Sequence, residues 1–198
     1  MQVIAYHVIF CTHGFWLPND PRGSGSTEVR YEPLREFGEA TYIDTKRSVA
    51  GKPHDRSLRK RAKQAMKYPE VQLTGRQALS VGVGFKAMAA KSGYVIYACS
   101  ILPQHVHMVV ARHRYSIEQV VRLLRQAGTA HLLEDNLHPF AHLRAANGRL
   151  PSIWAQDFRK VFLFTTDDVY RRIKYVEDNP LKDGLPKQHW SFVVPYVA

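Results

Sequence analysis

Two apolar segments joined by a short link limit the possible folds most strongly. Residues 94–101, YVIYACSI, and residues 105–112, HVHMVVAR, are rich in β-branched and aromatic side chains, a composition typical of strands. The first segment leads through Pro103 directly into the second. This arrangement predicts that the two segments form adjacent antiparallel strands.

The remaining segments alternate around this strand pair. Apolar runs predict strands over residues 3–12 and 161–165, and helical spacing of apolar residues predicts helices over 76–91, 116–135 and 167–178. We expect the last helix to stop where Asn179 precedes Pro180. The order of elements predicts an α+β fold of ferredoxin-like type, with helices packed on an antiparallel sheet.

Charge and composition indicate a nucleic-acid partner. The chain has 198 residues, a formal net charge of +11 and a pI near 9.8, and such a protein attracts polyanions. No apolar run approaches the length of a membrane span, and the opening MQVIAYHVIF lacks the basic start of a signal peptide. Cys11 and Cys99 each lie in an apolar run, which predicts reduced core residues. We therefore expect a cytoplasmic, nucleoid-associated protein that is not embedded in a membrane.

His105 and His107 stand one residue apart in the second strand of the pair. Side chains alternate along a strand, so both imidazoles project from one face, about 6.5–7 Å apart along the backbone. They could converge on one ion. A partly exposed histidine pair on a sheet face is the structural alternative. A zinc site is disfavoured, because neither cysteine lies at a recognisable metal-binding spacing from a histidine.

Tyr175 and Asn179 lie four residues apart in the last predicted helix and therefore face the same side. Tyr170 is the nearest rival, but the residue four positions after it is Lys174, whose ammonium group cannot bind a metal. Tyr170 also points about 140° away from Tyr175 around the helix. Packing of Tyr175 in the core, without a role in any site, is the structural alternative.

The histidine strand and this helix together resemble the single-tyrosine HUH transposases, the insertion-sequence and REP-associated family, whose motif is histidine, hydrophobic residue, histidine. His105-Val106-His107 matches that motif within LPQHVHMVV. The resemblance extends to the tail IKYVEDNPLKDGLPKQHWSF and to the opening YHVIFCTHGFWLPNDPRGS. It implies one transposase-like domain over residues 1–198 with the sheet of an HUH endonuclease. Residues 19–74 and 135–160 are longer than such a core requires and are expected to be insertions.

The resemblance also implies a chemistry. By position, Tyr175 would be the nucleophile, and Mg²⁺ or Mn²⁺ would be held by His105, His107 and Asn179. A tyrosine hydroxyl must lose its proton to attack a phosphodiester, and a cationic site favours that loss. The implied activity is that of a DNA transposase that cuts and rejoins single-stranded or hairpin DNA through a 5′-phosphotyrosine. Members of the family act as monomers or as homodimers, and both states stay open.

Basic side chains supply candidate contacts to DNA. The segment RSLRKRAKQAMK has six basic residues and no acidic one. The candidates for contact with a phosphate backbone are Arg59, Lys60 and Arg61 in this segment, and Arg122 and Arg125 in the helix after the histidine strand. A solvated helix face is the alternative for the basic segment. Three aromatic residues could stack on unpaired bases or pack under loops: Trp16, Trp154 and Phe158.

Two other classes of function stay open. A two-histidine phosphoesterase needs two H-x-S/T signatures, and the chain offers only His189-Trp190-Ser191. A non-catalytic nucleic-acid-binding protein derived from a transposase would have lost its site. Because His105, His107 and Tyr175 are all present, the residues favour the enzyme.

Overall fold

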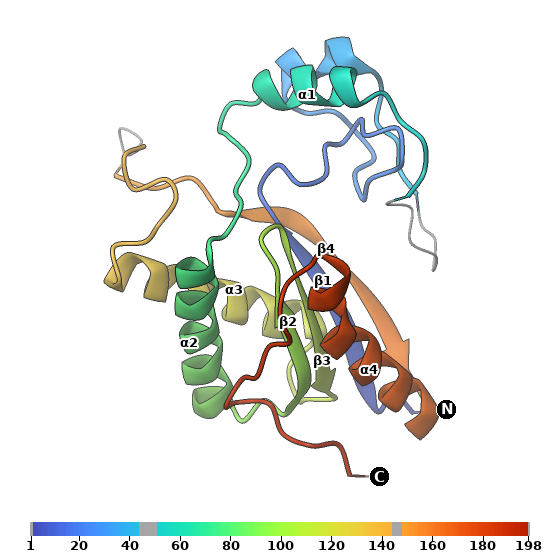
Figure 1. Cartoon of the computed structure of the whole chain (residues 1–198), viewed down its shortest axis with the longest axis vertical. Helices are drawn as coiled ribbons and strands as arrows, with labels where there is room; N and C mark the ends of the chain where they lie inside the picture. Colours follow the sequence, from blue (N-terminus) through green and yellow to red (C-terminus); the bar gives the residue numbers. More distant parts are fainter. Residues whose placement is uncertain (1, 44–50, 144–147, 198) are drawn as a thin grey trace.

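A four-stranded antiparallel sheet forms the centre of the molecule (Figure 1). The computed structural model describes residues 2–43, 51–143 and 148–197. The strands are β1 (Ala5–Thr12), β2 (Ile96–Ile101), β3 (His105–Ala111) and β4 (Trp154–Leu163), in the spatial order β2-β3-β1-β4. This order, together with the helices packed on the sheet, confirms the predicted α+β fold of ferredoxin-like type.

The histidine strand β3 lies inside the sheet. It pairs antiparallel with β2, as predicted, and on its other side with β1. The register with β1 places Ile9 opposite His107 and Cys11 opposite His105. Both histidines therefore stand on a strand whose backbone is hydrogen-bonded along both edges.

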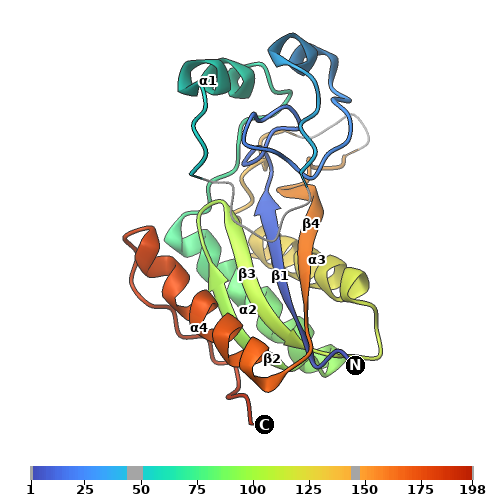
Figure 2. The same ribbon diagram turned by 90° about the vertical axis from the view of Figure 1, so that its right-hand side faces the viewer.

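Helices cover both faces of the sheet (Figure 2). α2 (Gly75–Ser92) and α3 (Ile117–Glu134) pack against each other on one face, and α4 (Thr166–Lys182) lies on the other face against β2 and β3. Side chains of Thr74 and Gln77 cap the first turn of α2 reciprocally. No helix in the described part of the chain is long and apolar enough to cross a membrane.

Alternation along the strands divides the core into two layers. Val8 and Met108 point toward α2 and α3 in the main core, whereas Ala5 and Val109 belong to a smaller cluster with α4. The histidines of β3 have odd numbers, like Val109. They therefore project toward the face that α4 covers.

Two element boundaries differ from the predictions by more than two residues. β4 begins at Trp154, so it takes up the end of the segment 135–160 that was expected to be a loop. This part of β4 carries exposed polar residues because it is an edge strand, paired only with β1. α4 continues through Pro180 to Lys182. Pro180 is buried in the last turn, where its missing N–H removes a single helical hydrogen bond.

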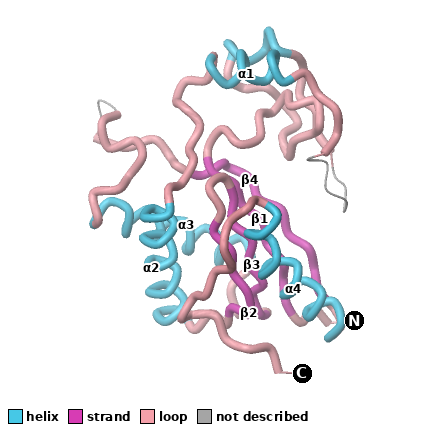
Figure 3. Tube along the Cα trace, viewed as in Figure 1, coloured by secondary structure: helices cyan, strands magenta, loops and turns pink. Residues whose placement is uncertain are grey.

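An arm projects beyond the end of the sheet at which β1 ends and β3 begins (Figure 1). It consists of residues 13–43 and 51–70 and holds two short helices, η1 (Glu32–Phe37) and α1 (Arg56–Gln64), whereas the rest of its path is largely loop (Figure 3). The arm has a hydrophobic cluster of its own, whose buried members are Leu17, Val29, Leu34 and Ala62.

Hydrogen bonds close the base of the arm. The backbone N–H of Val71 donates to the carbonyl of His13 at 2.9 Å, and the Thr12 hydroxyl donates to the carbonyl of Val71 at 2.7 Å. Thr12 is fully buried. The chain therefore leaves the sheet and returns to it at one place, beside the end of β1.

Gly84→Ala should destabilise the fold, because a Cβ atom at this position in α2 would lie 2.5 Å from the carbonyl oxygen of Ala127 in α3. The contact is with backbone, so the helices would have to separate, and such overpacking costs about 1–3 kcal/mol. Urea denaturation measures the free energy of unfolding. Gly75→Ala is the control, since its Cβ would meet no atom of the described residues within 4 Å. Equal stability of the two variants would contradict the close packing of α2 on α3.

Candidate active site on the histidine face

Three histidines share the face of the sheet that looks toward α4. His105 and His107 come from β3, and His7 comes from β1. The register of β1 against β3 places His7 diagonally next to His107. His7 was not among the site residues predicted from the sequence. A polar ring inside an otherwise apolar strand was the signal that could have found it, as for the other two.

His7 and His107 are joined by a hydrogen bond of 3.0 Å between Nε2 of His7 and Nδ1 of His107. Their rings are stacked, with centroids 5.3 Å apart, and the two residues are 1% and 5% exposed. Burial lowers the pKa of His7 to about 3, helped by the nearby charges of Arg172 and Arg159. Burial also holds the pKa of His107 well below its ordinary value. Both imidazoles are therefore neutral near pH 7.

The neutral state of His107 determines which of its ring nitrogens can accept a hydrogen bond or bind a metal. A neutral imidazole has one N–H, so when Nδ1 of His107 donates to His7, its Nε2 keeps a free lone pair. A metal-binding histidine is usually oriented in this way, by a hydrogen bond from its other ring nitrogen. In that arrangement His7 holds the ring of His107 in place and is not itself a ligand.

Tyr175 reaches the histidines from α4. Its ring centroid lies 5.7 Å from that of His7 and 5.6 Å from that of His107, both in edge-to-face contacts. The neighbouring Val176 is fully buried in the cluster between α4 and the sheet, which fixes the rotation of the helix. Tyr170 instead packs against Tyr196 and is 48% exposed. The structure thus brings Tyr175 to the histidines and leaves Tyr170 away from them.

Asn179 lies one helical turn after Tyr175, as the spacing predicts. It remains helical although Pro180 follows, because α4 continues to Lys182. Asn179 is 7% exposed, and its Nδ2 atom is buried with no hydrogen-bond partner among the described residues. A buried amide without a partner is costly in a structural role and points to a group that the protein alone does not supply.

His105 stands at the end of β3 next to the arm. Its ring lies edge-to-face on His107 at 4.9 Å and is stacked on Phe15 at 5.3 Å between centroids. Its Nδ1 atom is buried and has no hydrogen-bond partner within the described ranges. Burial lowers the pKa of His105, and the charge of Asp183 opposes this effect in part. His105 is therefore a neutral ring with an unused nitrogen.

Positive charge gathers around Tyr175. The ammonium group of Lys182 lies 4.1 Å from the centroid of the Tyr175 ring, and the guanidinium carbon of Arg172 lies 5.9 Å from it. Both cations also contribute to the low pKa of His107. Arg159 on β4, opposite Ile9, acts on His7 in the same way. A site with several cations and neutral histidines is suited to an anionic ligand such as a phosphodiester.

The side chains at this face could hold a divalent ion only if an amide oxygen is one of the ligands. The described residues contain no group of three or more His, Cys, Asp or Glu side chains placed to hold a metal. The available donors are the neutral rings of His105 and His107 and the amide of Asn179, in which Nδ2 and Oδ1 can be exchanged by a flip. An ion held by two imidazoles and one amide oxygen would have coordination positions left for further oxygen ligands.

The other predicted DNA contacts lie in different places. Arg125 donates to the carbonyls of Gln156 and Asp157 at 3.0 Å and so ties α3 to β4; burial lowers its pKa to about 10. Arg122 is exposed on α3, on the face opposite the histidines. The arm holds Arg59, Lys60 and Arg61, the last two exposed.

The three aromatic candidates all have partners within the protein. Trp154 is 7% exposed, and its indole N–H donates to Thr129 at 3.0 Å. Phe158 packs beneath Arg125, and Trp16 lies beneath Arg22, at 4.3 Å between ring centroid and guanidinium carbon. Of the two interpretations, stacking on bases or packing under a loop, packing describes Trp154 best. Trp16 and Phe158 are only partly buried.

Comparison with known proteins identifies the fold. No protein-family model matches the chain, and no curated protein matches it. The structure of a REP-associated tyrosine transposase bound to a REP hairpin has a TM-score of 0.50 and 14% identity, over 97% of this chain and 76% of that chain. A chain from Deinococcus radiodurans, provisionally assigned as a transposase, has a TM-score of 0.44 and 13% identity, over 90% and 92%. The likeness to the first structure confirms the predicted fold class.

The bond between His7 and His107 should appear as energetic coupling. His7→Phe and His107→Phe each leave a buried ring nitrogen of the other residue unpaired, which costs about 1–3 kcal/mol. The double variant removes both polar groups together, so its loss should be smaller than the sum by about 0.5–3 kcal/mol. Urea denaturation of the wild type and the three variants measures the free energies of unfolding for this double-mutant cycle. Additive losses would show that the two rings do not interact.

Proposed function

We propose that this chain is a metal-dependent DNA transposase that cuts and rejoins single-stranded or hairpin DNA through a covalent 5′-phosphotyrosine. The observation that carries the proposal is the position of Tyr175 in α4, whose ring lies 5.6 Å from that of His107 in β3. The fold likeness to a REP-associated tyrosine transposase bound to a REP hairpin supports the class of reaction and of substrate.

Tyr175 would act as the nucleophile. Its Oη attacks the phosphorus, its proton passes to solvent, and the bond between phosphorus and O3′ breaks. The electron pair stays on O3′, which takes a proton and leaves as a 3′-hydroxyl, while the 5′ end is held on the tyrosine. In the second step a 3′-hydroxyl attacks the same phosphorus and Tyr175 regains its proton. The phosphotyrosine keeps the ester bond for rejoining, which suits strand transfer better than degradation.

The cations beside Tyr175 would bind the phosphate. A phosphodiester repels nucleophiles through its own charge, so Lys182 and Arg172, both in cation–π contact with the Tyr175 ring, would offset that charge at the reacting group. Both residues lie on α4, the helix that also carries Tyr175. Their charges would therefore stay close to the Tyr175 hydroxyl if the helix moved. This arrangement supports a reaction at an anionic phosphorus centre.

The residues that would hold Mg²⁺ or Mn²⁺ are His105, His107 and Asn179. When bound, such an ion neutralises charge on the phosphodiester and orients it. His7 would keep the ring of His107 in the orientation that leaves Nε2 available. Among the described residues, Nδ1 of His105 and Nδ2 of Asn179 have no hydrogen-bond partner, and a flip of the Asn179 amide would put its oxygen in the place of Nδ2, which supports this assignment.

Tyr175→Phe should abolish the covalent protein–DNA adduct while leaving folding and DNA affinity intact, because only the hydroxyl is removed. The measurement is a denaturing gel after incubation with 5′- and 3′-labelled hairpin DNA and Mn²⁺. Tyr170→Phe is the matched control and should keep the adduct, since Tyr170 packs against Tyr196. An adduct that survives Tyr175→Phe would name another nucleophile. DNA binding by the wild-type chain without any adduct would favour the non-catalytic alternative.

His105→Ala should lower the cleavage rate by about 100- to 1000-fold, because the several kcal/mol that a bound ion contributes to transition-state stabilisation are lost. Mn²⁺ affinity, measured by calorimetry without DNA, should fall with it. DNA affinity should change little, since contacts from Lys and Arg to phosphates do not depend on the ion. His142→Ala, at an exposed position outside the site, is the control. Wild-type cleavage by His105→Ala would disprove the metal assignment.

A further inference from the structure

The arm carries a basic hollow of its own, with a volume of about 890 Å³. The basic side chains that line it are Arg22, His54, Arg56, Arg59, Lys60 and Lys63. Glu70 is the one acidic side chain among its described lining residues, and it is paired with Lys63. The hollow therefore has a strong net positive charge, which is typical of a surface that binds a polyanion.

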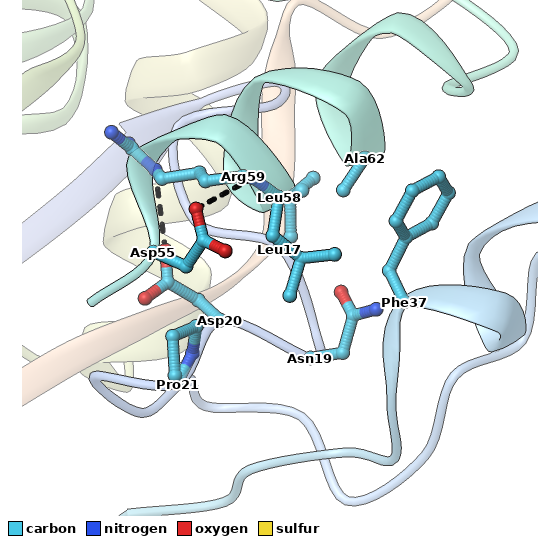
Figure 4. A pocket seen from close by; sticks show the side chains of 9 residues that line it. All are labelled: Leu17, Asn19, Asp20, Pro21, Phe37, Asp55, Leu58, Arg59 and Ala62. Atoms are coloured by element: carbon cyan, nitrogen blue, oxygen red, sulfur yellow. Dashed lines mark hydrogen bonds and ion pairs between the residues drawn. The ribbon is translucent and has the colours of Figure 1, made fainter.

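A buried ion pair holds the hollow in shape. Asp20, whose side chain is fully buried, accepts two hydrogen bonds from the Arg22 side chain at 2.8 and 2.9 Å, and Arg59 Nε lies 3.4 Å from it. Figure 4 shows Arg59 of α1 reaching Asp20 at the neighbouring pocket of the arm. Although burial alone would raise the pKa of Asp20, these arginines lower it, so the carboxylate stays charged. The pair fixes α1 against the loop that begins the arm.

Two other cations of the hollow point outward and are available to a ligand. Arg56 and Lys60 are exposed on α1, and neither forms an ion pair with an acidic residue in the described part of the chain. Arg59, in contrast, is engaged with Asp20 and with the carbonyl of Phe15 at 3.2 Å. The arm thus uses Arg59 to position α1 and presents Arg56 and Lys60 outward.

Ring contacts connect the hollow with the histidine face. Arg22, which lines the hollow, lies over Trp16 at 4.3 Å. Trp16 contacts Phe15 at 5.3 Å between centroids, and Phe15 is stacked on His105, also at 5.3 Å. One elongated ligand could therefore follow these residues from the hollow to the candidate active site.

We propose that the hollow binds the sugar–phosphate backbone of a double-stranded DNA stem, whose adjoining single strand continues over Trp16 and Phe15 to His105. Surfaces that hold unpaired strands combine cations with aromatic rings on which bases stack. No Phe, Tyr or Trp residue is among the described residues that line the hollow, whereas Phe15 and Trp16 connect it with His105. The hollow thus has the cations for phosphate contacts without a large aromatic side chain on which bases could stack. This inference rests on the proposed function for the single-stranded part of the substrate.

The test compares a variant with Arg56→Ala and Lys60→Ala against one with Lys86→Ala and Lys91→Ala. The second pair removes the same charge from exposed positions on α2. Fluorescence anisotropy measures the affinity of each full-length protein for a DNA hairpin with a single-stranded tail, and for an unpaired oligonucleotide of equal length.

We expect the arm variant to bind the hairpin about 10- to 100-fold more weakly near 0.1 M salt, with a salt slope reduced by about 0.9 for each lost phosphate contact. Its affinity for the unpaired oligonucleotide should change by less than about threefold, as should both affinities of the α2 variant. An unchanged hairpin affinity, an equal loss for the unpaired strand, or an equal loss in the α2 variant would each overturn the proposal.

Adduct formation at Tyr175 separates this inference from the proposed function. At saturating DNA the arm variant should form the adduct at the wild-type rate, because the hollow does not contribute to the reacting groups. If the wild type forms no adduct while the arm variant still loses hairpin affinity, the proposed chemistry fails and the stem-binding surface stands. If the arm variant loses the adduct at saturation, the hollow is part of the active site and the assignment to a stem is wrong.

Discussion

The pairing of β1 with β3 is the constraint on which the candidate site depends. With Ile9 opposite His107, His7 stands beside His107 and the two rings form a buried hydrogen bond. A shift of the register by one residue would turn His7 to the other face, into the core under α2 and α3. Because β3 is paired on both edges, the backbone that carries its histidines cannot move without breaking the sheet. The side chains that α4 contributes therefore meet a rigid surface.

Burial and charge act together at this surface. The histidines are kept neutral because they are buried and because Arg159, Arg172 and Lys182 stand nearby. A charged imidazole would be repelled by these cations, whereas an anion placed between them would be attracted. Neutral rings suit a metal ion and nearby cations suit an anionic ligand, and this face has both. Nδ2 of Asn179 is buried with no hydrogen-bond partner in the described part of the chain, and such ligands would offset the cost.

The sequence predicted more of the sheet than of its surroundings. The β2–β3 pair and the shared face of His105 and His107 follow from strand composition and from the period of two, which are local properties. The early start of β4 was not predictable, since an edge strand is paired on one side and tolerates polar residues. The contact of His7 with His107 and the engagement of Arg125 with β4 depend on register and on distant contacts, which no local pattern encodes.

The arm illustrates how a segment with a small core can still be held in a defined position. Its own hydrophobic cluster has four buried members among the described residues, so burial contributes little compared with the main core. Asp20 compensates, because a fully buried carboxylate is tolerated only while it is paired, and removal of Arg22 would take away the two side-chain hydrogen bonds that this residue donates to it. The Val71 hydrogen bonds and the stack of Phe15 on His105 then tie this unit to the end of β1 and β3. A few polar and ring contacts therefore fix the position of the basic hollow relative to the histidine face.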